Sequence, residues 1–100
     1  MSGPLRVGVV GCGGIAQMMH LPTIAERPDL FRLTALADVD RAVLGGVGER
    51  YGGALFADYR ELLALDEVDA VLLCASGSHR EAALGTLWNL AFPDSPPLLA

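Results

Sequence analysis

The chain has 100 residues, of which 52% are apolar and 19% charged, and its formal net charge is −5. This composition excludes a disordered tail, and the acidic balance argues against a nucleic-acid partner, which normally requires a basic surface. Two cysteines without C-x-x-C spacing exclude a disulfide framework and a zinc site. Because no signal peptide and no membrane-length apolar run is found, the sequence predicts a cytoplasmic protein without membrane contact.

The first predicted unit is a strand followed by a helix. The valine-rich run Leu5–Val10 reads as a buried strand that ends in a glycine turn. A helix is predicted over residues 14–26, in which Pro22 removes one backbone donor and should introduce a kink or a restart. Apolar residues at helical spacing indicate this helix, namely Ile15, Met18 and Met19. The two methionines are predicted to pack in the core.

The second and third units repeat the alternation of strand and helix. Asp40 and Asp58 each precede a run with helical character, and both are typical of residues that cap a helix. Three glycines should weaken the helix that follows Asp40. The predicted elements are a strand at 32–37, a helix at 41–51, a strand at 54–56 and a helix at 58–65.

The fourth unit is an apolar strand followed by a helix. The run Ala70–Ala75 is continuous, as expected of a parallel strand covered on both faces, and the helix is predicted from about His79 to Asn89. The acidic residues before this strand are interpreted as a solvated turn: Asp66, Glu67 and Asp69. The order βαβαβαβα predicts an α/β fold with a parallel sheet and right-handed crossovers.

A glycine-rich motif lies where the first strand ends and the first helix begins. It matches G-x-G-x-x-A, in which Gly11 permits the tight turn, Gly13 lets the backbone approach a pyrophosphate, and Ala16 allows close packing of helix on strand. Free N–H groups and the helix dipole favour an anion there. A simple glycine turn and a methyltransferase-type site are the alternatives. The predicted cofactor-binding residues of this loop are Gly11, Gly13, Gly14, Ile15 and Ala16.

An acidic residue stands at the end of the second strand. Asp38 lies 22 residues beyond Ala16, close to the spacing of about 20 at which a carboxylate accepts hydrogen bonds from the adenosine ribose. Its charge would repel a 2′-phosphate and so favours NAD, whereas Arg41 could turn toward such a phosphate and keeps NADP open. The alternative role for Asp38 is a turn or capping residue. The sequence therefore predicts a dinucleotide-binding, Rossmann-type sheet with strand order 3-2-1-4.

Further segments stand in a characteristic order: Val7–Ala16, His20–Pro22, Ala35–Asp38, Asp58–Tyr59 with Leu62–Leu63, and Val68–Val71. With them the chain resembles the amino-terminal domain of the Gfo/Idh/MocA oxidoreductase family over about residues 5–87. The resemblance implies a Rossmann fold that binds NAD or NADP and an ancestral hydride transfer involving a sugar, polyol or related hydroxyl compound. It also implies that residues 75–79 line the cofactor, which adds Ser76 and His79 to the predicted cofactor-binding residues.

The chain departs from the family pattern after Leu87. Family members continue with a Glu-Lys-Pro segment whose lysine assists proton transfer, and then with a second α/β domain, whereas all seven basic residues here are arginine. We therefore predict no catalytic residue and no hydride transfer by this chain alone, and leave open whether it is an enzyme. We expect a partial nucleotide-binding domain at residues 1–90 and an irregular tail at 91–100, in a truncated, frame-shifted or artificially shortened product.

The shortened sheet has a predicted consequence for partners. Without further strands, Ala70–Ala75 becomes an exposed edge, which favours self-association or pairing with a complementary chain. A non-catalytic interaction module and a non-functional remnant are therefore the alternative functions. Cys12 and Cys74 end the first and fourth strands, and we interpret them as small buried apolar residues rather than as a redox pair.

Overall fold

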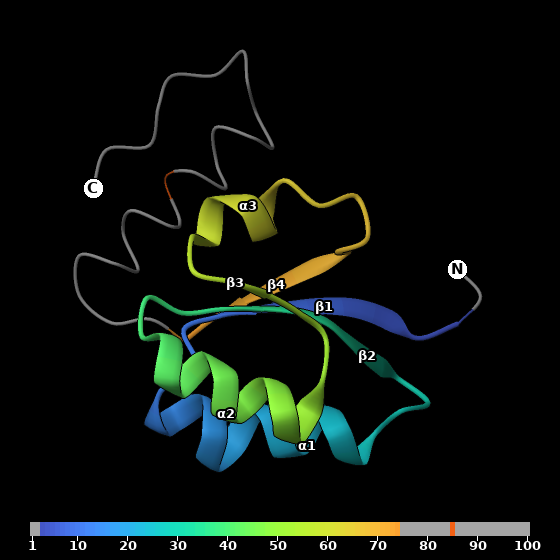
Figure 1. Cartoon of the computed structure of the whole chain (residues 1–100). Helices are drawn as coiled ribbons and strands as arrows, with labels where there is room; N and C mark the ends of the chain where they lie inside the picture. The colour runs from blue at the N-terminus through green and yellow to red at the C-terminus, as the bar shows by residue number, and fades with distance from the viewer. Residues whose placement is uncertain (1–2, 75–84, 86–100) are drawn as a thin grey trace.

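Four parallel strands form one sheet that carries helices on both faces (Figure 1). In the computed structural model, which describes residues 3–74 and residue 85, the strand order is β3-β2-β1-β4. This order and the α/β Rossmann-type fold confirm the prediction from sequence. The strands are β1 (Leu5–Val10), β2 (Phe31–Ala37), β3 (Ala54–Phe56) and β4 (Ala70–Leu73).

The helices cover the two faces unequally. Figure 1 shows α1 (Leu21–Glu26) and α2 (Arg41–Tyr51) side by side on one face and α3 (Tyr59–Leu63) on the other. The predicted helix over residues 14–26 forms, but its middle, η1 (Ala16–His20), is a π-helix. There the N–H of Leu21 donates to the carbonyl of Ala16, five residues back. The predicted disturbance at Pro22 thus appears as a widened turn directly before the proline, which has no N–H to donate.

Strand alternation divides the core between the two faces of the sheet. Val7 and Val9 of β1 point toward the first helix and α2, whereas Val10 points toward α3. Gly8 lies on the α3 side, and a Cβ at this position would come within 2.8 Å of Leu62 Cδ2. Glycine at position 8 therefore lets the buried Leu62 approach the backbone of the central strand.

The prediction that Met18 and Met19 pack in the core is wrong. Met18 and Met19 are 80% and 56% exposed, while Ala16 and Leu21 are fully buried. The π-helical turn explains the difference, because it places residues five apart on the same side of the helix. The helical segment therefore buries Ala16, Leu21 and Ile24 against the sheet, whereas the apolar spacing in the sequence had indicated the methionine side.

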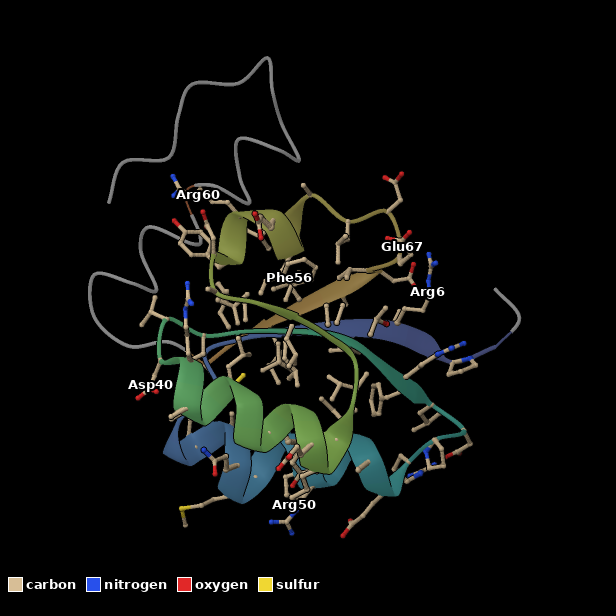
Figure 2. The ribbon with its side chains drawn as sticks, viewed as in Figure 1. Arg6, Asp40, Arg50, Phe56, Arg60 and Glu67 are labelled. Carbon is tan, nitrogen blue, oxygen red and sulfur yellow. The ribbon has the colours of Figure 1, made fainter. Side chains whose placement is uncertain are left out.

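Aspartates cap two of the helices as predicted. The Asp40 carboxylate accepts hydrogen bonds from the N–H groups of Ala42 and Val43, at 3.0 and 3.2 Å. Figure 2 shows Asp40 at the beginning of α2. The Asp58 carboxylate accepts from the N–H of Arg60 at 2.9 Å. The predicted helix over 58–65 is shorter in the structure, because the N–H of Leu65 turns back to the carbonyl of Leu62.

β4 lies at one edge of the described sheet and pairs with β1. All four of its residues have intermediate burial. Leu72 packs against the core on one face of the sheet, and Val71 and Leu73 pack against the core on the other, so β4 is contacted on both faces as the sequence predicted. Cys74 extends the pairing, because its N–H donates to the carbonyl of Val10 at 2.8 Å, whereas Ala75 lies outside the described residues. Within the part of the chain that the structure describes, no helix is long and apolar enough to cross a membrane.

The amino-terminal ends of β1 and β4 are joined by an ion pair. The Arg6 guanidinium donates to both carboxylate oxygens of Asp69, at 3.0 and 2.8 Å, and the backbone N–H of Arg6 donates to the same carboxylate at 3.0 Å. Figure 2 shows Arg6 beside Glu67 at this end of the sheet. The interpretation of Asp66, Glu67 and Asp69 as a solvated turn therefore fails for Asp69, which fastens β4 to β1.

This pair gives folding a pH dependence. The hydrogen bonds from Arg6 lower the pKa of Asp69 from 3.8 to about 2. Since the folded-state value lies below the unfolded one, the stabilisation is present above about pH 4 and is lost as the pH falls through about 2. We predict that Asp69→Asn flattens the fall in the free energy of unfolding over this range, measured by urea denaturation.

Asp29→Asn is the matched control. It removes the partner of Arg27 in a pair whose side chains are 54% and 62% exposed and which links neighbouring residues of one turn. Such a pair contributes little to stability. An equal effect of both substitutions would contradict the role given to Asp69.

Candidate functional site

The candidate site lies at the carboxyl end of the central strand, between β2 and β4. The crossover to β2 runs to one side of β1 and that to β4 lies on the other, so the loop after β1 stands where the strand order reverses. Gly11 begins this loop with φ of 91°, in the left-handed region that favours glycine. Its N–H donates to the carbonyl of Ala37 at 2.8 Å, which fixes the start of the loop on β2.

The following residues present backbone N–H groups that have no recorded acceptor within the described part of the chain. The first helical hydrogen bond runs from the N–H of Gln17 to the carbonyl of Gly13, at 3.1 Å. The N–H groups between residues 13 and 15 have no recorded acceptor among the residues that the structure describes. A Cβ at Gly13 or Gly14 would meet no atom within 4 Å, whereas Ala16 is fully buried. The loop is therefore open on its outer side, and its donors are available to an anion.

Asp38 is tied directly to this loop. One carboxylate oxygen accepts from the N–H of Cys12 at 2.7 Å, and the other accepts from the N–H of Asp40 at 2.8 Å. The first bond joins the ends of β1 and β2, and the second forms the turn that leads into α2. Asp38 thus also has the turn role that the sequence left as its alternative. Each oxygen of a carboxylate accepts about two hydrogen bonds, so both retain acceptor capacity.

The structure brings most of the predicted site residues together. The loop residues and Asp38 meet at one end of the sheet, whereas Ser76 and His79 lie outside the described residues. Sequence reasoning missed Gln17, whose side-chain amide donates to the carbonyl of Cys12 at 2.8 Å. A glutamine at this position is not part of the glycine motif, so nothing in the motif points to it. The only indication in the sequence is that its side chain, about one helical turn after the loop, is long enough to reach back to it.

Cys12 occupies the interior of the site and not its surface. Its side chain has 0% exposure, and its thiol lies 3.6 Å from the carbonyl of Ala37. Burial raises the pKa of Cys12 to about 12, and the nearby charge of Asp38 adds to this effect. Cys74 is half-buried and packs against the same core. Among the described residues, no group of three His, Cys, Asp or Glu side chains is arranged to hold a metal ion.

Comparison with known proteins decides the family. The model of the Gfo/Idh/MocA family, described as an oxidoreductase family with an NAD-binding Rossmann fold, matches residues 5–89. The chain belongs to this family. The assignment confirms the resemblance seen in the sequence, and it makes the sheet with its glycine loop an NAD(P)-binding Rossmann domain.

Individual Gfo/Idh/MocA proteins agree with this assignment. Inositol 2-dehydrogenase of Rubrobacter xylanophilus is 41% identical over 86 residues, which are 85% of this chain and 24% of that protein. A dTDP-3,4-didehydro-2,6-dideoxy-alpha-D-glucose 3-reductase of Actinomadura kijaniata is 44% identical over 70 residues, 68% of this chain and 20% of that protein. The chain therefore spans about a quarter or less of the length of these curated relatives.

Solved structures of Gfo/Idh/MocA proteins share the fold. A variant of KijD10, a 3-ketoreductase from Actinomadura kijaniata in complex with TDP-benzene and NADP, superposes with a TM-score of 0.80 at 31% identity, over 89% of this chain and 28% of that one. The WlbA dehydrogenase from Bordetella pertussis, in complex with NADH and UDP-GlcNAcA, gives 0.70 at 28% identity, over 75% and 22%. Relatives with this domain have thus been crystallised with either type of nicotinamide cofactor.

The raised pKa of Cys12 predicts a thiol that does not react in the folded chain. In a Cys74→Ser variant, Cys12 is the single thiol, and at pH 8 we expect it to react with an aromatic disulfide reagent about a thousandfold more slowly than an exposed cysteine. The rate is measured by release of the coloured thiolate. Denaturant should restore full reactivity, and rapid stoichiometric labelling without denaturant would contradict the buried position.

Proposed function

We propose that this chain binds NAD through the loop after β1 and the carboxylate of Asp38. Gly11, Gly13, Gly14, Ile15 and Ala16 form the part that holds the pyrophosphate, and Asp38 accepts hydrogen bonds from the adenosine ribose. The observation that carries the proposal is the loop itself. Its backbone donors have no recorded acceptor among the described residues, and the space beside Gly13 is open, because a Cβ there would meet no atom within 4 Å. Ser76 and His79 are proposed as further cofactor contacts from the family resemblance.

The charge of Asp38 supports NAD over NADP. Both carboxylate oxygens are held in place by backbone N–H groups, so the negative charge stays beside the ribose position. A 2′-phosphate there would meet a like charge. Arg41, the residue directly after Asp40, is exposed at the beginning of α2 and keeps NADP as a weaker ligand.

The proposed role is that of the cofactor-binding part of an oxidoreductase acting on a sugar, polyol or related hydroxyl compound. When bound, the nicotinamide supplies hydride transfer, and the residues described here bind and orient the nucleotide. These 100 residues contain no lysine, which supports the proposal that they are not catalytic by themselves. We place the chain in the cytoplasm and assign residues 1–90 to the nucleotide domain and 91–100 to a tail.

The decisive test is a titration of the chain with NAD after substitution of Gly13. Gly13→Val should weaken binding about tenfold or more, because a side chain there occupies the space into which the pyrophosphate must come. Position 13 has no positive φ and its Cβ meets no protein atom, so the fold is expected to remain intact. Calorimetry gives the affinity, and urea denaturation gives the stability.

The same titration contains its own controls. Gly45→Ala on α2 also adds a Cβ in open space and should leave the affinity for NAD unchanged. NADP should bind the unsubstituted chain more weakly than NAD. If Gly13→Val and Gly45→Ala bind NAD equally well, or if the unsubstituted chain binds neither nucleotide, the proposed function is wrong.

The edge position of β4 supports a further part of the proposal, namely association with a second copy or a complementary chain. Its residues are partly exposed and apolar, and its pairing with β1 uses one side of the strand. We predict that the sedimentation coefficient of the purified chain rises with concentration. Ala70→Lys adds a charge at a partly exposed residue of β4 that belongs to neither core cluster, and it should reduce the rise. A coefficient independent of concentration would contradict the association.

A further inference from the structure

Two side chains hold the backbone of Cys12, one at its N–H and the other at its carbonyl. The carboxylate of Asp38 accepts from the N–H of Cys12 at 2.7 Å, and the side-chain amide of Gln17 donates to the carbonyl of Cys12 at 2.8 Å. Asp38 lies 26 positions from Cys12 in the sequence, and Gln17 lies 5 positions from it. The orientation of this part of the loop therefore depends on side chains and not only on the backbone.

Within residues 3–74, no backbone N–H of the helix is recorded as a donor to the carbonyl of Cys12. Its first hydrogen bond runs from the backbone N–H of Gln17 to the carbonyl of Gly13, one residue after Cys12. The Gln17 side chain thus supplies the donor that the helical ladder leaves out. Without it the carbonyl of Cys12 is free to rotate, and a carbonyl oxygen turned toward the adjacent N–H groups would repel a phosphate.

We infer that Gln17 is a positioning residue for the phosphate-binding loop: by holding the carbonyl of Cys12 it keeps the N–H groups after it directed at the pyrophosphate. This inference rests on the proposed function and adds a residue outside the glycine motif to it. The side chain must be a neutral donor. Glutamate has the same shape, but its carboxylate offers no proton to the Cys12 carbonyl and adds a negative charge beside the phosphate site.

The ligand comparison separates positioning from general stability. Gln17→Ala should weaken NAD binding about five- to tenfold, the loss expected for one neutral hydrogen bond, and Gln17→Glu should weaken it further. Adenosine, which has the ribose but no phosphate, should bind both variants as it binds the unsubstituted chain. Calorimetry measures NAD binding, and ligand-observed NMR measures adenosine binding.

Thr23→Ala is the matched control. Thr23 is an exposed residue of the same helix whose hydroxyl donates to the backbone carbonyl of Met19 at 2.7 Å, so its substitution removes the same kind of bond away from the loop. Its affinity for NAD should be unchanged. Urea denaturation of all the variants should give midpoints close to that of the unsubstituted chain, because Gln17 and Thr23 are both exposed.

A second readout needs no nucleotide. In the unsubstituted chain the amide order parameters of Gly13 and Gly14 should be near 0.85, as in rigid backbone, and in Gln17→Ala they should fall below about 0.6. Unchanged order parameters together with unchanged NAD affinity would overturn the inference, as would an equal loss of adenosine and NAD binding. If the unsubstituted chain fails to bind NAD, the proposed function fails and the nucleotide role of Gln17 fails with it. The order parameters then still decide whether the hydrogen bond from Gln17 to the Cys12 carbonyl orders the loop.

Discussion

The hydrogen bond from the backbone of Cys12 to the carboxylate of Asp38 connects the elements on which the site depends. At 2.7 Å it joins the loop after β1 to the turn after β2. The second oxygen of Asp38 bonds the backbone of Asp40, which in turn caps α2. One side chain therefore fixes the direction in which the chain leaves two neighbouring strands, and the candidate site lies beside them at the carboxyl end of β1.

The two ends of the sheet are built differently. At the amino-terminal end, Arg6 and Asp69 close the sheet with several hydrogen bonds between charged groups, and their side chains satisfy each other. At the carboxyl end, the backbone donors of residues 13–15 have no recorded acceptor among the described residues, and the glycines there leave the space beside them open. Structural closure at one end and open donors at the other are what a parallel sheet with a ligand crevice at its carboxyl edge requires.

Much of this arrangement could be predicted from the sequence, because local patterns determine it. The valine run of β1, the glycine turn, the caps at Asp40 and Asp58 and the distance to Asp38 all follow from backbone and spacing rules, and they led to the correct strand order. The exposed position of Met18 could not be predicted, because the π-helical turn before Pro22 changes which residues face the sheet.

The contacts of Asp69 and Gln17 were also beyond the sequence. Asp69 stands in a run of acidic residues that looks like any solvated turn, and its partner Arg6 is 63 positions away, so only the pairing of β1 with β4 brings them together. Gln17 donates to the carbonyl of Cys12, which the backbone of the helix leaves available because its first recorded hydrogen bond goes to the carbonyl of Gly13, the next residue. Both depend on three-dimensional geometry that residue identity does not encode locally.

Gly11 and Gly13 are required for different reasons, Gly11 for the fold and Gly13 for the proposed nucleotide site. Gly11 has a backbone angle that other residues rarely adopt, so every descendant that keeps the fold is under pressure to keep it. Gly13 has no such angle and no crowded neighbour, so folding alone would tolerate alanine there. A lineage that had abandoned the nucleotide would therefore be free to drift at position 13 while remaining fixed at position 11, and natural variants of this domain can be sorted by that difference.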